Sequence, residues 1–442
     1  ADDTVIAQAT DTQEDVLTED SGSFAQLDDK IQNTPVNGSI KLDKNYTYSS
    51  GERVGTNGIV INKDITIDGD GHTIDGADMA SIFSITNNAQ VTLKNIVFAN
   101  ALGTYGSAIS LSSSENVEII NSQFINNSAF YGGAIYVASA DSSSITSSLN
   151  IVDSTFVNNT ASRSGGAIYV SGALTNIYSS TFKHNTATLD GGSIYLDVGT
   201  HVEDCVFQDG SAGHNGGAMY LNCIADLSLI NPDDASRLGL FNTTISSCRA
   251  GNDGGAGFFN STKGTAVNTR FINNTAVNNG GGMVWICVNG TTYNITLINN
   301  TAINGNAGGM LLYPPEPLSM FDGVNIINSS TFKYNTAGGN GGALYCGGLF
   351  TIIYNSTFED DKAYDGAGIY LNVGAAITYC TLNNEIATND GGGIYLYASN
   401  ANMTGISESM MSMIMDNVGV SHSNITNCIA GHDGGAGYVY ES

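Results

Sequence analysis

The 442 residues carry 14 Lys and Arg against 41 Asp and Glu, which gives a formal net charge of −27. This balance excludes nucleic acid as a partner, because phosphate binding requires clustered cations. Apolar residues make up 41% of the chain and Gly contributes 54 residues, a composition that fits a packed core with many tight turns and excludes a disordered or collagen-like chain.

The first predicted element in chain order is a short helix. Residues before about 20 read as a polar, acidic tail. Ser23 is a good N-cap, and Phe24, Leu27 and Ile31 then fall on one helical face. We therefore assign residues 1–36 to a tail and a helix that caps the open end of the following domain. No apolar run in the chain approaches the length of a membrane-spanning helix.

A repeat dominates the rest of the chain. The segment Phe-x-Asn-Asn-Thr-Ala, followed by Gly-Gly-Ala-Ile-Tyr, recurs mostly every 25 or 26 residues. Its Phe position is occupied in eleven copies by Phe124, Phe156, Phe182, Phe207, Ile245, Phe271, Leu297, Phe332, Phe358, Leu382 and Ile425. A period of this size is typical of a solenoid, in which each unit buries its apolar face only against a neighbour. Residues 37–442 are predicted to form one such body.

The pattern within each unit predicts β-strands. Short alternating segments are interrupted by Gly, Asn and Asp, which leaves room for roughly three short strands per unit. Since crossovers between parallel strands are right-handed, the prediction is an all-β, right-handed parallel β-helix of about 14 rungs. Strand parity points the residues three and five after the first Gly inward, as at Ile135 and Val137. The Phe residues should form a second interior column, and the Asn three positions later suits a corner where amides hydrogen-bond along the axis.

A longer repeat of about 175 residues lies above the first. It indicates an internal duplication into residues of about 106–279 and 280–442. Extra residues interrupt both halves at corresponding places, near 138–148 and 314–324 and near 222–244 and 397–424. These insertion loops are candidates for recognition, although simple tolerance to insertion explains them equally well.

Strand parity also predicts an outward column of aromatic rings. It comprises Tyr136, Tyr169, Tyr195, Tyr220, Tyr345, Tyr370, Tyr395 and Tyr438. Neighbouring rungs would hold these rings about 4.8 Å apart. The column can stabilise the sheet by ring contacts, or it can bind carbohydrate or another protein chain.

Asparagines in Asn-x-Ser/Thr sequences are candidate glycosylation sites. Those singled out are Asn126, Asn158, Asn242, Asn273, Asn299 and Asn424. Seven cysteines are also present, but no two share a column in adjacent units. Buried free thiols are therefore favoured over disulfides.

Catalytic and metal-binding candidates are few. Asp233 and Asp234 lie in an insertion without matching Arg or Lys, and His72, His214 and His432 suit structural roles in turns. A calcium ladder could be imagined at Asp190, Asp253, Asp365, Asp390 and Asp433, but Asp before Gly is ordinary turn chemistry. We predict no enzyme activity, no metal and no cofactor.

The motifs resemble known families. The Gly-Gly-Ala-Ile and Phe-x-x-Asn motifs are similar to those of the polymorphic outer-membrane proteins of chlamydiae, and the chain as a whole resembles adhesin-like β-helix proteins of methanogenic archaea. The segment Gly69-Asp-Gly-His-Thr-Ile-Asp-Gly76 looks like the opening of many pectate-lyase-like β-helices. These resemblances imply a pectate-lyase-like fold.

The resulting functional prediction is a secreted, cell-surface adhesin-like or surface-assembly protein. Its outer face and insertion loops would bind other surface proteins, glycans or copies of itself. Because the repeat runs to Gly434 and beyond without a cap, end-to-end homo-oligomers are a further expectation. The alternative is a carbohydrate-active enzyme, either a polysaccharide lyase or a glycoside hydrolase.

Overall fold

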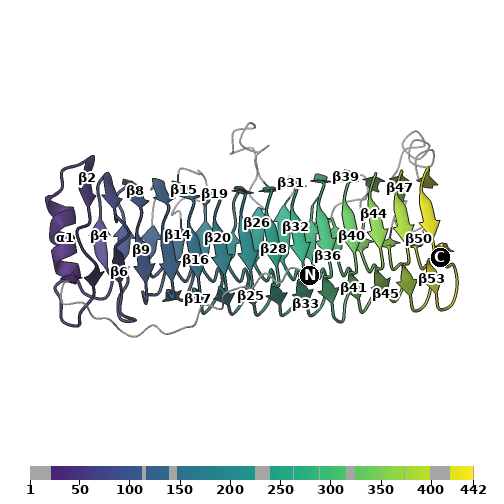
Figure 1. Cartoon of the computed structure of the whole chain (residues 1–442), viewed down its shortest axis with the longest axis horizontal. Helices are drawn as coiled ribbons and strands as arrows, with labels where there is room; N and C mark the ends of the chain where they lie inside the picture. The colour runs from purple at the N-terminus through teal and green to yellow at the C-terminus, as the bar shows by residue number, and fades with distance from the viewer. Residues whose placement is uncertain are drawn as a thin grey trace, which may run out of the picture.

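The chain is a right-handed parallel β-helix, as the repeat predicts (Figure 1). The computed structural model describes residues 21–111, 116–138, 147–223, 239–261, 263–287, 289–314, 324–348, 350–372, 374–398 and 419–441. Most residues of the four predicted insertion loops, together with Asp233 and Asp234, lie outside these ranges, as does the predicted tail before residue 21. Among the described residues, no helix combines the length and the apolar character that crossing a bilayer would demand.

Four parallel sheets run the length of the rod within the described residues, with 15, 14, 14 and 11 strands. The Phe sheet consists of β1 (Gly22–Ser23), β3 (Tyr46–Thr47), β6 (Thr73–Asp75), β9 (Val97–Ala99), β12 (Gln123–Ile125), β16 (Thr155–Val157), β20 (Thr181–Lys183), β24 (Val206–Gln208), β28 (Thr244–Ser246), β32 (Arg270–Ile272), β36 (Thr296–Ile298), β40 (Thr331–Lys333), β44 (Thr357–Glu359), β48 (Thr381–Asn383) and β52 (Asn424–Thr426). The Ala sheet consists of β13 (Ser128–Ala129), β17 (Thr160–Ala161), β21 (Thr186–Ala187), β25 (Ser211–Ala212), β29 (Arg249–Ala250), β33 (Thr275–Ala276), β37 (Thr301–Ala302), β41 (Thr336–Ala337), β45 (Lys362–Ala363), β49 (Ile386–Ala387) and β53 (Ile429–Ala430).

The other two sheets complete each rung. The Tyr sheet consists of β4 (Ile59–Ile61), β7 (Phe83–Ile85), β10 (Ile109–Leu111), β14 (Ile135–Ala138), β18 (Ile168–Ser171), β22 (Ile194–Leu196), β26 (Met219–Cys223), β30 (Gly257–Ser261), β34 (Met283–Ile286), β38 (Met310–Tyr313), β42 (Leu344–Cys346), β46 (Ile369–Leu371), β50 (Ile394–Ala398) and β54 (Gly437–Glu441). The closing sheet consists of β2 (Gly38–Lys41), β5 (Ile65–Asp68), β8 (Gln90–Lys94), β11 (Asn116–Ile120), β15 (Ser147–Val152), β19 (Ala173–Tyr178), β23 (Thr200–Glu203), β27 (Gly239–Phe241), β31 (Lys263–Val267), β35 (Asn289–Tyr293), β39 (Val324–Asn328), β43 (Phe350–Tyr354), β47 (Ala375–Thr378) and β51 (Gly419–Ser421).

Each repeat unit therefore makes four strands, where the sequence predicted roughly three. The additional strand is the two-residue Thr-Ala segment of the Ala sheet, as in the pairing of Thr160 with Thr186 and Ala161 with Ala187. A segment this short carries no alternating pattern, so its pairing becomes visible only when the rungs are stacked.

The core follows the repeat columns. Consecutive Phe residues pair in register, as Phe124 with Phe156 and Phe156 with Phe182. Their rings are buried and stack with centroids 4.6 Å apart. The predicted inward residues of the Tyr sheet, such as Ile135 and Val137, are also buried. Stacking identical rungs thus repeats one packing solution along the axis.

Two corners of the repeat rungs hold non-glycine residues in the left-handed backbone conformation. One follows the closing-sheet strand, as at Asn121 (φ 45°), and the other follows the Phe-sheet strand, as at Asn126 (φ 57°) and Asn158 (φ 57°). Asn tolerates this region better than most residues, because its short amide can hydrogen-bond locally. The corner geometry therefore explains much of the Asn content of the chain.

An interior ladder of asparagine amides runs along the axis, as the sequence predicted. Its members are buried and comprise Asn127, Asn159, Asn185, Asn274, Asn300 and Asn335. Nδ2 of Asn127 donates to Oδ1 of Asn159 at 3.0 Å, and Nδ2 of Asn159 donates in turn to Oδ1 of Asn185 at 3.0 Å. These bonds link neighbouring rungs within the core, in two runs that Gly210 and Cys248 separate between Asn185 and Asn274.

The helix α1 (Phe24–Asn33) covers the N-terminal end of the coil, in agreement with the prediction (Figure 1). Its residues Phe24, Leu27 and Ile31 are buried. Ser23 and Gln26 form a capping box, since Ser23 Oγ accepts from the Gln26 N–H at 3.2 Å and Gln26 Oε1 accepts from the Ser23 N–H at 3.1 Å.

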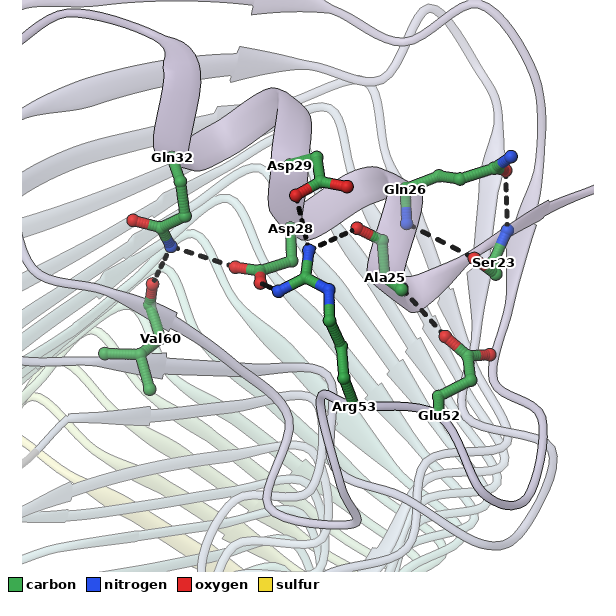
Figure 2. Close-up of polar contacts among 9 residues, drawn as sticks. All are labelled: Ser23, Ala25, Gln26, Asp28, Asp29, Gln32, Glu52, Arg53 and Val60. Carbon is green, nitrogen blue, oxygen red and sulfur yellow. Dashed lines mark hydrogen bonds and ion pairs between the residues drawn. The ribbon is translucent and has the colours of Figure 1, made fainter.

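The loop between β3 and β4 holds the helix in place. Figure 2 shows Arg53 reaching the helix, where it contacts Asp28 Oδ2 at 2.7 Å and Asp29 Oδ1 at 2.6 Å. The neighbouring Glu52 accepts a hydrogen bond from the Ala25 N–H at 2.7 Å, which satisfies a backbone donor of the first helical turn (Figure 2).

The cysteines of the described residues are free thiols. Cys205, Cys248, Cys287, Cys346 and Cys380 are buried, and Cys428 is partly buried. The side chain of Cys223 lies outside the described residues. The prediction of buried free thiols is thereby confirmed for these five positions.

Candidate functional site

The aromatic column of the Tyr sheet forms two stacks. In the first, Tyr136, Tyr169, Tyr195 and Tyr220 occupy equivalent positions in successive rungs. Successive centroids lie 5.4, 4.7 and 5.0 Å apart, and the ring planes differ by 6° to 11°. Phe258 continues this stack at 5.2 Å from Tyr220. The flanking positions, such as Ile168 and Val170, are buried while the Tyr is half-buried, so the rings face outward as parity requires.

The second stack contains Tyr345, Tyr370, Tyr395 and Tyr438. The first three rings stack at 4.9 and 4.8 Å. Tyr345, Tyr370 and Tyr395 are only 8%, 7% and 8% exposed, so they offer little ring surface to a ligand. Val284 and Leu311 occupy the two intervening positions of the column and separate the stacks.

Burial of the rings changes their acidity. It raises the pKa of Tyr169 in the first stack to about 12, and it raises the pKa of Tyr345 and Tyr395 in the second stack to about 12. These phenols are therefore neutral hydrogen-bonding groups at physiological pH.

Glycine turns flank the column. Gly132 has φ 58°, and a Cβ there would collide with the carbonyl oxygen of Ile135. At Gly391, where φ is 65°, a Cβ would lie 3.0 Å from Cβ of Tyr395. The recurrent Gly is thus required both by its backbone conformation and by the close approach of the turn to the aromatic column.

A polar column precedes these glycines. Asn215 N–H donates to Asp190 Oδ1 at 3.1 Å, and Asp433 N–H donates to Asp390 Oδ1 at 3.0 Å. These carboxylates take part in turns that join adjacent rungs. Acidic and amide oxygens therefore run beside the tyrosines, at the same corner of the rod.

An exposed aromatic cluster that the sequence did not single out extends the first stack toward the N-terminus. Tyr105 and Phe130 are 49% and 41% exposed. The centroid of the Tyr105 ring lies 4.8 Å from that of Tyr136. The centroid of the Tyr131 ring lies 4.9 Å from that of Tyr169. The Arg163 guanidinium lies 5.3 Å from the centroid of the Phe130 ring. We call Tyr105, Phe130 and Tyr131 the aromatic cluster. The sequence could have indicated this cluster, because Phe130 and Tyr131 directly precede Gly132 at positions where other units have mostly polar residues.

The six candidate glycosylation asparagines, Asn126, Asn158, Asn242, Asn273, Asn299 and Asn424, are all exposed. The first five adopt positive φ, and Asn424 lies in β52. Some also stabilise the corner, since Asn299 Nδ2 donates to Asn273 Oδ1 at 2.8 Å. Glycosylation of these six sites stays a prediction, and at the first five the corner conformation by itself accounts for asparagine.

The predicted chemical candidates do not assemble into a catalytic arrangement in the described part of the chain. His214 Nδ1 lies 3.3 Å from Asp190 Oδ1, and His72 lies in a different coil near the N-terminus. Among the described residues, Asp390, His432 and Asp433 bring three ligand-type atoms within 4.8 Å of one another. Both His432 and Asp433 are exposed in a turn, a setting where such groups are common without a metal ion.

Comparison with protein families gives one match. Residues 153–171 and 329–347 match the model of the Chlamydia polymorphic membrane protein repeat. Each segment runs from the end of a closing-sheet strand to the Tyr sheet, so the match covers the motif that carries the stacks. No curated protein and no solved structure matches the chain significantly. The resemblance to chlamydial repeats is confirmed for these segments, whereas the resemblance to archaeal proteins stays a prediction.

Proposed function

We propose that this β-helix is an adhesin-like protein of the cell surface that binds glycans through the aromatic cluster and the first tyrosine stack. The observation that carries the proposal is the exposure of Tyr105 and Phe130 at 49% and 41%, next to half-buried stacked rings. A contiguous exposed aromatic surface is typical of an interaction site.

The chemistry of the surface favours a sugar. Aromatic faces pack against the apolar faces of pyranose rings, while tyrosine hydroxyls and nearby carboxylates can accept hydrogen bonds from sugar hydroxyls. The match to a membrane-protein repeat supports a surface location. The second tyrosine stack contributes mainly to stability, because its first three rings are at most 8% exposed.

The test is binding of the full chain to an array of neutral and acidic glycans. The variant Tyr105→Ser/Phe130→Ser/Tyr131→Ser removes the aromatic cluster. We expect at least an approximately tenfold loss of affinity, corresponding to about 1.4 kcal/mol. The matched control is Tyr354→Ser/Tyr379→Ser, which removes two rings that are 43% and 52% exposed and stand 5.5 Å apart away from the stacks.

Binding that survives loss of the aromatic cluster, or that falls equally in the control, would contradict the proposal. Circular dichroism of each variant verifies that the fold is intact. If the array gives no ligand, the same pair of variants is compared for binding to other surface proteins immobilised from cell envelopes, and an equal response of both variants would exclude the aromatic cluster there too.

Binding rather than catalysis is part of the proposal. Prolonged incubation with an acidic polysaccharide should therefore leave its chain length unchanged, and depolymerisation would favour the lyase or hydrolase alternative. Association of the rods with copies of themselves is proposed as a second mode of assembly. Light scattering over a concentration series should show a mass that increases with concentration, and a constant monomer mass would refute this mode.

A further inference from the structure

Two carboxyl groups replace amides in the interior ladder. Asp361 and Glu385 follow Asn335 in the same column, and both are completely buried. Asp361 Oδ1 accepts from the Asn335 N–H at 2.6 Å and from Asn335 Nδ2 at 2.9 Å, as an asparagine oxygen does elsewhere in the ladder. The Asp361 N–H donates in turn to Glu385 Oε2 at 3.0 Å. The two acids therefore continue the ladder as acceptors.

The two carboxyl groups lack the N–H donor that an asparagine amide provides. Asn335 Nδ2 also donates to the carbonyl oxygen of Leu297 at 3.0 Å, so an amide nitrogen in this column has two acceptors. Asp361 carries Oδ2 in place of this nitrogen, and Oδ2 has no hydrogen-bond partner among the described residues. Glu385 Oε1 is likewise without a partner within the described residues. Two buried, unpartnered oxygens on adjacent rungs are costly unless a hydrogen is present.

The surroundings do not neutralise the pair. Within the pair, Asp361 disfavours ionisation of Glu385. The charge of Asp360 disfavours ionisation of both carboxyls, and Cys428 further disfavours ionisation of Glu385. Two cations belong to these rungs: Lys333 is paired with Glu359 at 2.8 Å on the surface, and Lys362, which follows Asp361 in the chain, is exposed to solvent. Like charges in such a site cannot both be ionised without a large penalty.

We propose that Asp361 and Glu385 hold a buried proton that completes the interior ladder, and that loss of this proton at alkaline pH loosens the C-terminal rungs. As a carboxylic acid, one of the pair supplies the O–H that the missing amide would have supplied. On deprotonation the proton passes to solvent hydroxide, the O–H donor is lost, and a negative charge remains in the core.

The direction of the pH effect follows from the burial. Burial raises the pKa of both carboxyls well above the usual value of about 4. Between about pH 4 and the raised pKa, the folded state binds more protons than the unfolded state, so stability falls as the pH rises. The protonated pair therefore makes its full contribution to folding stability below about pH 4, and this contribution is lost progressively through the neutral and alkaline range.

The first half of the duplication provides a natural comparison. The positions equivalent to Asp361 and Glu385 are Asn185 and Gly210, followed by Cys248 where the second half has Cys428. The first half therefore has no buried carboxyl in this column. Hydrogen exchange of segments around 182–212 therefore reports on equivalent rungs without a buried carboxyl, inside the same molecule.

The experiment uses the full chain and the variant Asp361→Asn/Glu385→Gln. Infrared spectroscopy near neutral pH should show the carbonyl stretch of a protonated carboxyl group in the native protein and not in the variant. Hydrogen-exchange protection of residues 344–396, corrected for the intrinsic pH dependence, should fall at least about tenfold from about pH 5 to about pH 9 in the native protein. In the variant, and around 182–212 in both proteins, protection should stay constant.

The matched control is Asp153→Asn, the same chemical change at an exposed corner of the first half (φ 50°), which should leave both the infrared band and the pH profile unchanged. If the double variant does not fold, Asp361→Asn alone restores the residue found in the preceding rungs and should still reduce the band. Absence of the band in the native protein, or a pH profile that the variants share with it, would overturn the proposal.

Discussion

Replacing Asn159 with leucine tests the interior ladder at a residue whose side chain makes four hydrogen bonds. Asn159 is fully buried, and its Oδ1 accepts from the Asn127 N–H at 3.1 Å and from Asn127 Nδ2 at 3.0 Å. Its Nδ2 donates to the carbonyl oxygen of Phe124 at 3.0 Å and to Asn185 Oδ1 at 3.0 Å. Leucine has a similar volume but can make none of these four bonds.

The expected cost follows from the groups left behind. The Asn127 N–H and one hydrogen of its amide lose their acceptor, and the carbonyl of Phe124 loses a donor. Each buried group without a partner costs about 1–3 kcal/mol, and the added apolar contacts of leucine offset about 1 kcal/mol. We therefore expect Asn159→Leu to destabilise these rungs by roughly 2–8 kcal/mol.

Hydrogen exchange measures this loss where it occurs, because each rung of a solenoid contacts mainly its neighbours. Amides of β12, β16 and β20 should lose protection, while those of β40 and β44 should not. The control Asn158→Gly changes the adjacent exposed corner, whose φ of 57° glycine accepts readily. A loss below about 1 kcal/mol, or one equal to that of the control, would refute the ladder as a major source of stability.

Three further predictions concern other parts of the rod. Phe182→Ala should cost about 3–5 kcal/mol in denaturant unfolding, but Phe182→Leu should cost less than about 1.5 kcal/mol, because leucine fills the same column at Leu297; equal costs would contradict the column interpretation. Ser23→Ala should reduce the local stability of α1 by about 1 kcal/mol, seen as faster exchange confined to the helix, whereas unchanged exchange would show that the cap is dispensable. Burial raises the pKa of Cys248 and Cys346 to about 12, so a thiol reagent at neutral pH should modify these two only after unfolding, and rapid labelling of the native chain would exclude their burial.

The sequence determined the columns. Residues one period apart occupy equivalent positions in adjacent parallel strands, so Phe156 must lie over Phe124 and Asn159 over Asn127 once the period is recognised. Side-chain alternation then assigned the inward positions and the outward tyrosines, and the capping motif before Phe24 located the helix. These features depend on local periodicity, which can be recognised in a single sequence before its tertiary structure is known.

The tertiary structure decided what the columns expose. Tyr169 and Tyr370 occupy the same place in the repeat, yet one is half-buried and the other is 7% exposed, because exposure depends on the turns and side chains that neighbouring rungs place beside each ring. The aromatic cluster joins residues of two rungs across a turn whose shape the period does not specify. The unpartnered oxygens of Asp361 and Glu385 depend on the tertiary structure in the same way. A carboxyl group lacks the N–H donor of an amide, and only the surrounding hydrogen bonds of the ladder show that a donor is needed there.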